Sequence, residues 1–300
     1  MTALLNTVLL VAVFSFPVQA DGPRFGNRID RGLIEYDPIT EASGIVASRK
    51  NPDVLWIHND HGNQNHLYAV NSQGKHLGVY VIAGVTNRDW EDIALGPGPR
   101  EGQHYLYIGD IGDNFAQYKR KYIYRVPEPV VNPHQAPVYT TLSEVEIITF
   151  QYPDGNRDAE TLLVDPLTKD LYVVSKREQQ VSVYRALYPQ STTDTLILDR
   201  VASVNLSMDV GVRGWTVGGD ISPSGREILM KTYLTIYYWY REPTQQLWEV
   251  LGHKPVTVSY VPEPQGEAVC WKADETGYYT VSEEDKGIPA HLYFYPRLSP

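Results

Sequence analysis

Short apolar runs alternate with polar turns along most of the chain, and the same arrangement recurs five times. In each copy an apolar run starts beside an acidic or small residue, and a turn rich in Gly, Pro, Asn or Asp follows. A second apolar run then ends in a polar loop. The clearest copy is Trp90-Glu-Asp-Ile-Ala-Leu followed by Tyr105-Leu-Tyr-Ile-Gly-Asp. Runs rich in Tyr, Val and Ile between such turns are typical of β-strands. A unit repeated in this way predicts a β-propeller.

Each of the first four repeats divides into four strands, of which the first lies nearest the axis. We expect strands at 43–47, 54–57, 67–70 and 77–82, then at 92–95, 105–108, 122–126 and 145–150, then at 161–164, 171–174, 181–185 and 196–204, then at 219–222, 228–230, 236–240 and 256–260, and finally at 268–271, 278–281 and 292–295.

The fifth repeat has only three strands, while residues 29–36 form a strand with no partner ahead of it. Pairing these two ends closes the ring and leaves no exposed sheet edge. We therefore predict an all-β fold, a five-bladed β-propeller whose N-terminal strand completes the last blade. A six-bladed ring, with a blade split out of the long insertion around 188–215, is the alternative.

The first twenty residues have a different character. An apolar stretch runs from Leu4 to Phe16, and Val18-Gln-Ala20 precedes Asp21. Its length and the small residues at its end are typical of a signal peptide and too short for a membrane span. We expect a signal peptide at 1–20, a single propeller domain at 21–300, and a secreted protein, periplasmic in a bacterium. No other segment is apolar for long enough to cross a bilayer, and we expect a monomer.

Composition narrows the choice of partners and of stabilising bonds. The formal net charge is −10, which argues against nucleic acid because phosphate binding needs a basic face. Cys270 is the only cysteine, so no internal disulfide can form, and its apolar surroundings indicate a buried thiol. Asn205-Leu-Ser207 is a glycosylation sequon.

The geometry of a propeller brings the first residues of the innermost strands to one mouth of the central channel. In this alignment those residues are Ser43, Glu91, Glu160, Gly218 and Glu267. Two carboxylates about 6 Å apart repel by about 3 kcal/mol at an effective dielectric near 20. A ring of three must hold a cation, shared protons or a basic side chain, unless the three point apart. Oxygen ligands in an irregular ring favour Ca²⁺.

Loops at the same mouth supply further polar groups. They include Asn59, Asp60, His61, Asn114, Tyr233, Glu283 and Glu284, together with Arg88, Asp89, Trp90, Arg157 and Asp158. Polar residues of both signs beside a metal are typical of hydrolytic sites. We expect Lys176, Arg177 and Lys231 to bind a negatively charged substrate, and Asp110, Asp113 or Glu178 to act as general base. The histidines His58, His61 and His66 could indicate zinc, but they lack a tight ligand set.

The strand starts Ser43-Gly-Ile, Trp90-Glu-Asp-Ile-Ala, Ala159-Glu-Thr-Leu-Leu and Gly266-Glu-Ala-Val resemble those of the calcium-dependent apyrases, which are secreted five-bladed nucleotidases. In that family Ser, Glu, Glu, Ser and Glu hold one axial Ca²⁺. The resemblance matches Ser43, Glu91, Glu160 and Glu267 to four of these ligands. The fourth position departs from the family, because Gly218 offers only its carbonyl, with Thr216 or Asp220 as possible substitutes.

The chain is also similar to secreted bacterial and invertebrate propellers that share Asp-Trp-Glu-Asp-Ile-Ala and Gly-Asp-Ile-Gly-Asp-Asn, and in style to calcium-bearing propeller phytases and lactonases. Three functions are compatible with these features. The first is a Ca²⁺-dependent hydrolase of a phosphorylated or otherwise anionic small molecule. The second is a non-catalytic module that binds an extracellular glycan or protein around a structural Ca²⁺. The third is a Ca²⁺-dependent lactonase or esterase with His58 or His61 as base. The fold does not decide among them.

Overall fold

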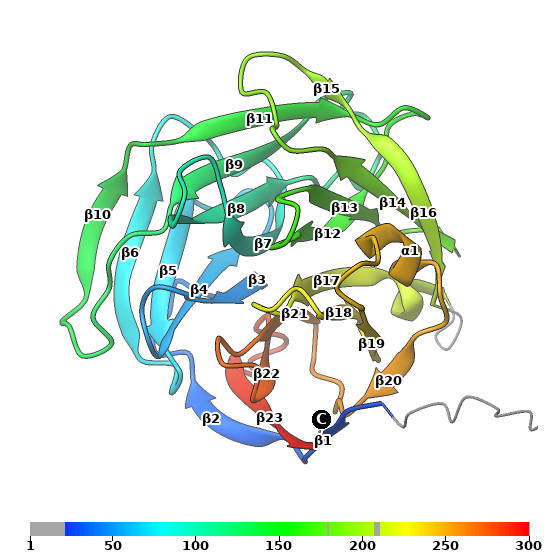
Figure 1. Ribbon diagram of the computed structural model, residues 1–300. Coiled ribbons are helices and arrows are strands. Elements are labelled where there is room, and N and C mark those ends of the chain that lie inside the picture. Colours follow the sequence, from blue (N-terminus) through cyan, green and yellow to red (C-terminus); the bar gives the residue numbers. More distant parts are fainter. Residues whose placement is uncertain (1–21, 179, 207–210, 300) are drawn as a thin grey trace, which may run out of the picture.

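Five sheets of mainly antiparallel strands are arranged around a common axis as the blades of a propeller (Figure 1). The computed structural model describes residues 22–178, 180–206 and 211–299. The prediction of a five-bladed propeller is confirmed. The predicted signal peptide at 1–20 and Ser207 of the sequon lie outside the described residues.

The strands follow the chain from the axis outward in each blade. Blade 1 contains β3 (Ala42–Ala47), β4 (Val54–Asn59), β5 (His66–Asn71) and β6 (His76–Ile82). Blade 2 contains β7 (Trp90–Pro97), β8 (His104–Asp110), β9 (Lys121–Pro127) and β11 (Glu146–Gln151). Blade 3 contains β12 (Ala159–Val164), β13 (Leu171–Ser175), β14 (Gln180–Ala186) and β16 (Asp199–Asn205).

Blade 4 contains β17 (Thr216–Ile221), β18 (Glu227–Thr232), β19 (Ile236–Tyr240) and β20 (Val256–Val258), with the short helix α1 (Leu247–Leu251) before its last strand. A 3-10 turn at Gly211–Gly214 precedes this blade. Blade 5 contains β21 (Gly266–Trp271), β22 (Gly277–Ser282) and β23 (His291–Ser299). None of the helices in the described ranges is long and apolar enough to cross a membrane.

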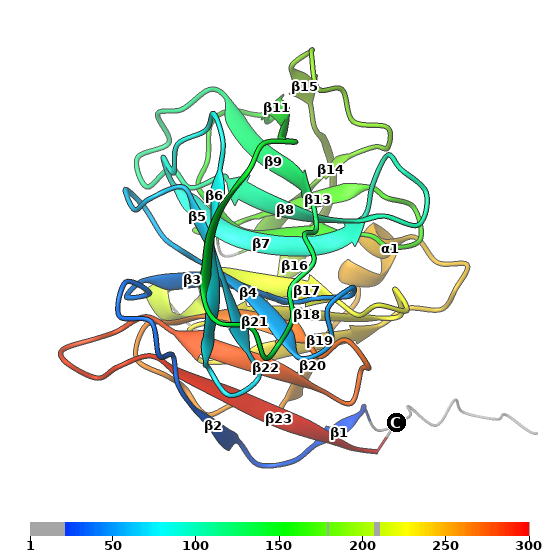
Figure 2. The same cartoon turned by 90° about the vertical axis from the view of Figure 1, so that its left-hand side faces the viewer.

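Residues from the two ends of the chain close the ring. The strands β1 (Arg24–Phe25) and β2 (Ile29–Leu33) both pair antiparallel with β23, and Figure 2 shows them side by side at the edge of blade 5. The predicted closure is confirmed, although the strand ends at Leu33 rather than Tyr36. Phe25 anchors it by packing on Trp271 and Tyr278.

Two extra strands connect neighbouring blades, and the repeat pattern did not predict them. Strand β10 (Val138–Leu142) leaves blade 2 and pairs parallel with β6 of blade 1. It can approach because Gly78 faces it, since a Cβ there would lie 2.8 Å from the side chain of Val138. Strand β15 (Leu196–Ile197) pairs with β11 of blade 2. The predicted single strand at 196–204 is therefore wrong, because its start belongs to a different blade from β16.

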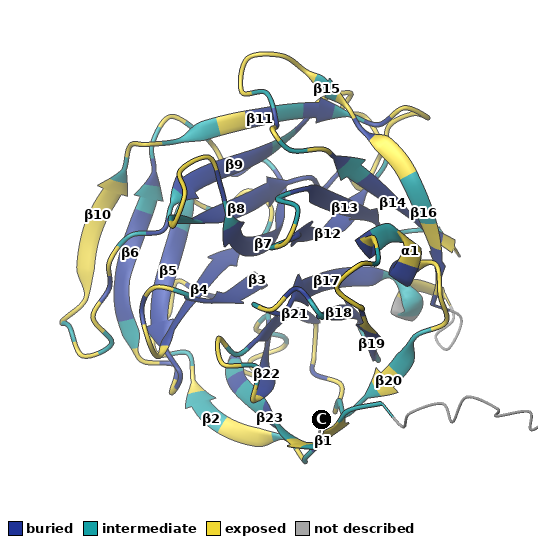
Figure 3. Cartoon of the chain, in the orientation of Figure 1, coloured by how far each residue is buried: buried dark blue, intermediate teal, exposed yellow. Residues whose placement is uncertain are grey.

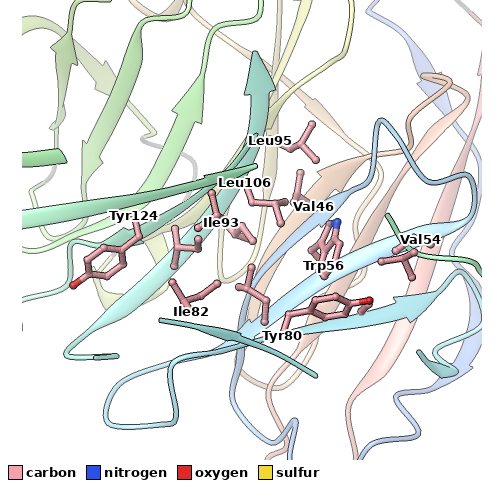
Figure 4. Close-up of a cluster of buried hydrophobic side chains, with 14 of the residues drawn as sticks. Val46, Val54, Trp56, Tyr80, Ile82, Ile93, Leu95, Leu106 and Tyr124 are labelled. Carbon is pink, nitrogen blue, oxygen red and sulfur yellow. The ribbon is translucent and has the colours of Figure 1, made fainter. Parts of the chain in front are cut away.

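The six-bladed alternative is also wrong. Within 188–206 and 211–215 the chain adds β15 and β16 to existing blades and forms no further sheet. The apolar side chains pack into five clusters, one at each junction between blades. Figure 4 shows the cluster between blades 1 and 2, where Trp56, Tyr80 and Ile93 meet.

Burial follows the distance from the axis. The innermost strands β3, β12, β17 and β21 are buried along their whole length, whereas β10 and β16 are largely exposed (Figure 3). Neighbouring blades cover both faces of each inner strand, so the polar residues of these strands are buried together with the apolar ones. The polar residues at the starts of these strands, among them Glu160 and Glu267, are buried as well.

Candidate metal centre

A β-bulge begins the innermost strand of every blade. The pairing with the second strand skips one residue, so that two residues on the inner strand oppose one on its partner. A bulge of this kind changes the direction of the side chain it carries. The skipped residues are Ser43, Glu91, Glu160, Val217 and Glu267.

This register corrects the sequence alignment in blade 4. Val217, not Gly218, occupies the position equivalent to the three glutamates. Gly218 follows it, close to the next blade, because a Cβ at Gly218 would lie 2.9 Å from the carbonyl oxygen of Glu267. The ring of side chains at the channel mouth is therefore open at the fourth blade, where an apolar residue stands. The turn-based alignment missed this because the bulge shifts the count by one residue.

Glu91 is the centre of an acidic cluster. Its carboxylate forms one group with Asp60 and Asp89, and a second group with Asp158 and Glu160, with the ligand atoms of each group within 4.8 Å of one another. All but Asp60 are buried. Oxygen atoms bound to one Ca²⁺ lie about 2.3–2.6 Å from the ion, so each group is compact enough to share one cation.

A glycine in the loop after β8 lies directly over this cluster. Gly112 follows β8, and a Cβ there would lie 2.0 Å from Glu91 Oε1 and 2.5 Å from the carboxyl carbon of Asp89. Its amide donates to the carbonyl oxygen of Asp89 at 3.2 Å. Lys121, which is fully buried, donates from Nζ to the Gly112 carbonyl oxygen at 2.9 Å. Only glycine leaves the carboxylates room at this point.

Basic side chains neutralise one group far more than the other. In the group of Asp158 and Glu160, Lys176 forms an ion pair with Glu160 and Arg177 donates from Nε to Asp158 at 2.6 Å. Glu160 Oε2 is nevertheless buried without a hydrogen-bond partner. Two cations thus face this group.

The other group has a single direct contact with a basic side chain among the described residues. Nδ1 of His61 lies 2.9 Å from Asp89 Oδ1. Within the part of the chain that the structure describes, neither Asp60 nor Glu91 has an ion-pair partner, and Asp60 Oδ1 is buried without a hydrogen bond. The group of Asp60, Asp89 and Glu91 is the more negative of the two.

Burial and mutual repulsion make these acids hard to ionise. Loss of solvent, followed by repulsion from Glu267, raises the pKa of Asp60 to about 7. Burial and the charge of Asp60 raise the pKa of Glu91 well above its usual value. The pKa of Glu283 rises to about 8 through burial and the charges of Glu267 and Asp60. These carboxyl groups must therefore either keep protons or share a bound cation.

The remaining predicted ligands lie farther from this centre. Glu267 Oε1 accepts a hydrogen bond from the Tyr233 hydroxyl at 2.8 Å, and it shares no three-carboxylate group with Glu91 and Glu160. Ser43 Oγ donates to the carbonyl oxygen of Glu91 at 2.6 Å. The structure thus brings Glu91 and Glu160 together as predicted, with Ser43 beside them.

Several predicted catalytic side chains are engaged in their own contacts. Arg88 lies 3.1 Å from Asp110, Lys121 lies 3.0 Å from Asp113, and Arg157 pairs with Glu178. Each of these three carboxylates therefore has a basic partner. None of these three carboxylates belongs to the groups of acids around Glu91.

Two further predicted residues are enclosed. His58 is fully buried, and burial lowers its pKa to about 4. Lys231 is also buried, donates to the carbonyl oxygen of Gly266, and has its pKa lowered to about 8 by burial. Of the three side chains predicted to bind a negatively charged substrate, Lys176 and Arg177 contact the acidic cluster directly, whereas Lys231 contacts the backbone of Gly266.

Sequence reasoning named Asp60, Asp89 and Asp158 as loop residues and missed their place beside Glu91. A signal for two of them is present in the chain. The tetrapeptide Arg-Asp-x-Glu occurs twice, at 88–91 and at 157–160, each time at the entry to an innermost strand. The repeated spacing of Asp and Glu identifies paired carboxylates at the same mouth.

Comparison with known proteins finds only distant similarity to solved structures. No family model matches the chain, and no curated protein matches it. Among solved structures, the RRP9 WD40 repeats align over 85% of this chain and 80% of that chain, with a TM-score of 0.40 and 11% identity. Hydrazine synthase of Kuenenia stuttgartiensis aligns over 85% and 95%, with a TM-score of 0.43 and 12% identity. Similarity at this level carries no information about ligands.

Proposed function

We propose that the chain binds Ca²⁺ at the mouth of its central channel and, with the bound ion, hydrolyses a phosphorylated or otherwise anionic small molecule. The observation that carries the proposal is the carboxylate of Glu91, which lies among four other carboxylates and has no basic partner among the described residues.

The donor set fits a hard cation. Asp60, Asp89 and Glu91 offer only carboxylate oxygens, the ligands that Ca²⁺ prefers. The cation belongs with this group rather than with Asp158 and Glu160, because Lys176 and Arg177 already balance the latter pair. Placing the ion beside Asp60 also relieves the repulsion that raises the pKa of that carboxyl group.

The opposite side of the cluster suits a negatively charged substrate. Arg177 lies 4.2 Å from the centre of the Trp215 ring, and Lys176 lies 5.7 Å from the same ring. Each of these two cations is already paired with a carboxylate of the cluster. Their remaining N–H groups, together with the indole, can donate to an anionic group and position it against the metal. A bound Ca²⁺ supplies charge stabilisation for an anionic oxygen and polarises a water molecule.

One observation favours a second candidate, a binding module without catalysis. The predicted general bases Asp110, Asp113 and Glu178 are each held in an ion pair. A carboxylate held in this way must leave its basic partner before it can take a proton from a substrate or a water molecule. In this alternative the same ion and the same basic side chains bind an extracellular anionic glycan without turnover.

The first experiment is a calorimetric titration of the full chain with Ca²⁺. We expect saturable binding that Glu91→Gln abolishes, because that variant removes the central charged ligand. Glu101→Gln changes an exposed acid on the opposite loops and serves as the control for net charge. Failure of the wild-type protein to bind Ca²⁺ would refute the metal site.

The second experiment screens turnover of p-nitrophenyl phosphate, nucleotides, phytate and lactones with Ca²⁺ or with EDTA. Hydrolysis of a phosphorylated compound that needs Ca²⁺ and is lost in Glu91→Gln supports the proposal. Turnover of lactones alone would point to the lactonase. Calcium binding with no turnover of any compound would favour the binding module without catalysis.

A further inference from the structure

We propose that a cavity on blade 2, distinct from the acidic cluster, binds a tetrahedral oxyanion, the phosphate or sulfate group of an ester. The cavity has a volume of about 430 Å³ and opens to solvent beside the loop between β8 and β9. Its lining residues are Arg88, Gln117, Tyr118, Lys119, Arg120, Tyr122 and Gln151.

The charge of this cavity is opposite to that of the whole chain. The formal net charge of the protein is −10, yet the residues lining the cavity include three basic and no acidic side chains. Just beneath it, Asp110 pairs with Arg88 and Asp113 pairs with Lys121. Those two carboxylates therefore balance the charges of Arg88 and Lys121. They do not pair with the remaining basic residues of the cavity.

Lys119 and Arg120 are the uncompensated cations. Both are exposed, and within the described ranges neither takes part in an ion pair. In the basic run Tyr118-Lys-Arg-Lys-Tyr122, the third basic residue, Lys121, is bound to the Gly112 carbonyl oxygen, and the first two basic residues line the cavity. Two free cations at one opening attract an anion, and charge-assisted hydrogen bonds to phosphate or sulfate oxygens are the strongest that such side chains make.

The shape of the cavity is fixed before a ligand arrives. The Arg88 guanidinium lies 4.3 Å from the centre of the Tyr118 ring and 5.3 Å from that of Tyr122. It also donates to the carbonyl oxygen of Arg120 at 3.2 Å. The amides of Gln117 and Tyr118 donate to Asp113 at 2.8 and 2.7 Å. A loop restrained in this way loses little conformational entropy when it binds.

The lining also indicates what the oxyanion is attached to. The cavity is larger than a single oxyanion needs, and two tyrosines and two glutamine amides line the rest of it. Aromatic rings and neutral hydrogen-bonding groups suit the uncharged ring of an aromatic ester or a sugar. We therefore infer an ester rather than a free inorganic ion as the ligand.

Calorimetric titration of the full chain with phenyl phosphate and with phenyl sulfate tests the site. EDTA is present throughout, so that the proposed calcium site contributes nothing to binding. The double variant Lys119→Gln/Arg120→Gln removes the two free cations. Lys75→Gln/Lys254→Gln removes the same charge from exposed positions outside the cavity and is the matched control.

We expect the cavity variant to lower the affinity at least about tenfold and the control variant to change it less than about twofold. Binding of only one compound identifies the ester as phosphate or sulfate, and binding of both supports the shared oxyanion chemistry. The inference is overturned if the wild-type protein binds neither compound, or if the cavity variant binds as tightly as the control. Retention of Ca²⁺ binding by the cavity variant would separate this result from the proposed metal site.

Discussion

At the scale of single residues, the candidate centre depends on the lack of a side chain at one glycine as much as on the carboxylates themselves. Gly112 has no side chain at the point where the backbone passes over Glu91 and Asp89. That absence lets the carboxylates stand close together under a buried loop. The loop itself is held by Lys121 and by the Asp113 amide, which donates to Asp158 at 2.7 Å.

We predict that Gly112→Ala weakens Ca²⁺ binding by at least about tenfold, because the added methyl group would displace Glu91 and Asp89, two of the three proposed ligands. Calorimetric titration with Ca²⁺ measures the effect. Gly252→Ala is the control, since Gly252 is exposed and has a φ of −71° that alanine adopts without strain. Unchanged affinity in Gly112→Ala would show that the loop does not shape the site.

At the scale of elements, the pairing of β1 and β2 with β23 holds the ring closed. Phe25 of β1 is buried, and its ring centre lies 4.8 Å from that of Tyr278 and 6.0 Å from that of Trp271. The residues that close the ring are thus part of the core between blades 4 and 5. Because neighbouring blades pack face to face through this core, an opening at the junction exposes two sheet faces at once.

We predict that Phe25→Ala lowers the free energy of unfolding by about 3 kcal/mol. The truncation leaves a cavity against Trp271 and Tyr278 and weakens the hold of β1 on the last blade. Chemical denaturation measures the change. Ile29→Ala, on the exposed side of β2, should cost less than about 0.5 kcal/mol. Equal losses in the two variants would contradict the anchoring role of Phe25.

At the scale of the whole molecule, the channel mouth gathers negative charge that no single blade contains. Asp60, Asp89 and Asp158 come from three loops far apart in sequence, and Glu283 adds a fourth. The folded protein therefore binds protons that the unfolded chain would release at the same pH. Stability should depend on pH in a direction set by these carboxyl groups.

We predict that the protein in EDTA becomes less stable as the pH rises from 6.5 to 8. The pKa of Asp60 is about 7 and that of Glu283 about 8 in the folded state, against about 4 in an unfolded chain. Between these values the folded state holds more protons, so the free energy of unfolding falls as the pH rises. The buried, neutral His58 has the opposite effect, but only below about pH 6.5.

Thermal unfolding across this pH range, with and without Ca²⁺, measures the effect. Added Ca²⁺ should remove most of the loss at pH 8, because the ion replaces the protons that the cluster releases. A melting temperature that rises between pH 6.5 and 8 in EDTA would contradict the raised pKa values. A melting temperature indifferent to Ca²⁺ would count against the metal site.

The sequence by itself predicted five blades, the order of most strands within them and the closure of the ring, and the structure excluded the six-bladed alternative. These features follow from local patterns, namely apolar runs, turn residues and a repeated unit. It also determined that Glu91 and Glu160 would meet, because equivalent positions of a repeat lie at equivalent places around an axis.

Only the tertiary structure decided the details of the centre. The bulge that puts Val217 in place of Gly218 and the parallel strands β10 and β15 depend on pairing between distant segments. The same is true of the balance of charge, in which Lys176 and Arg177 pair with Glu160 and Asp158, while Glu91 and Asp60 have no ion pair within the described part of the chain. Strand register and charge pairing of this kind are set by how distant segments pack in three dimensions, which the repeat pattern alone does not encode.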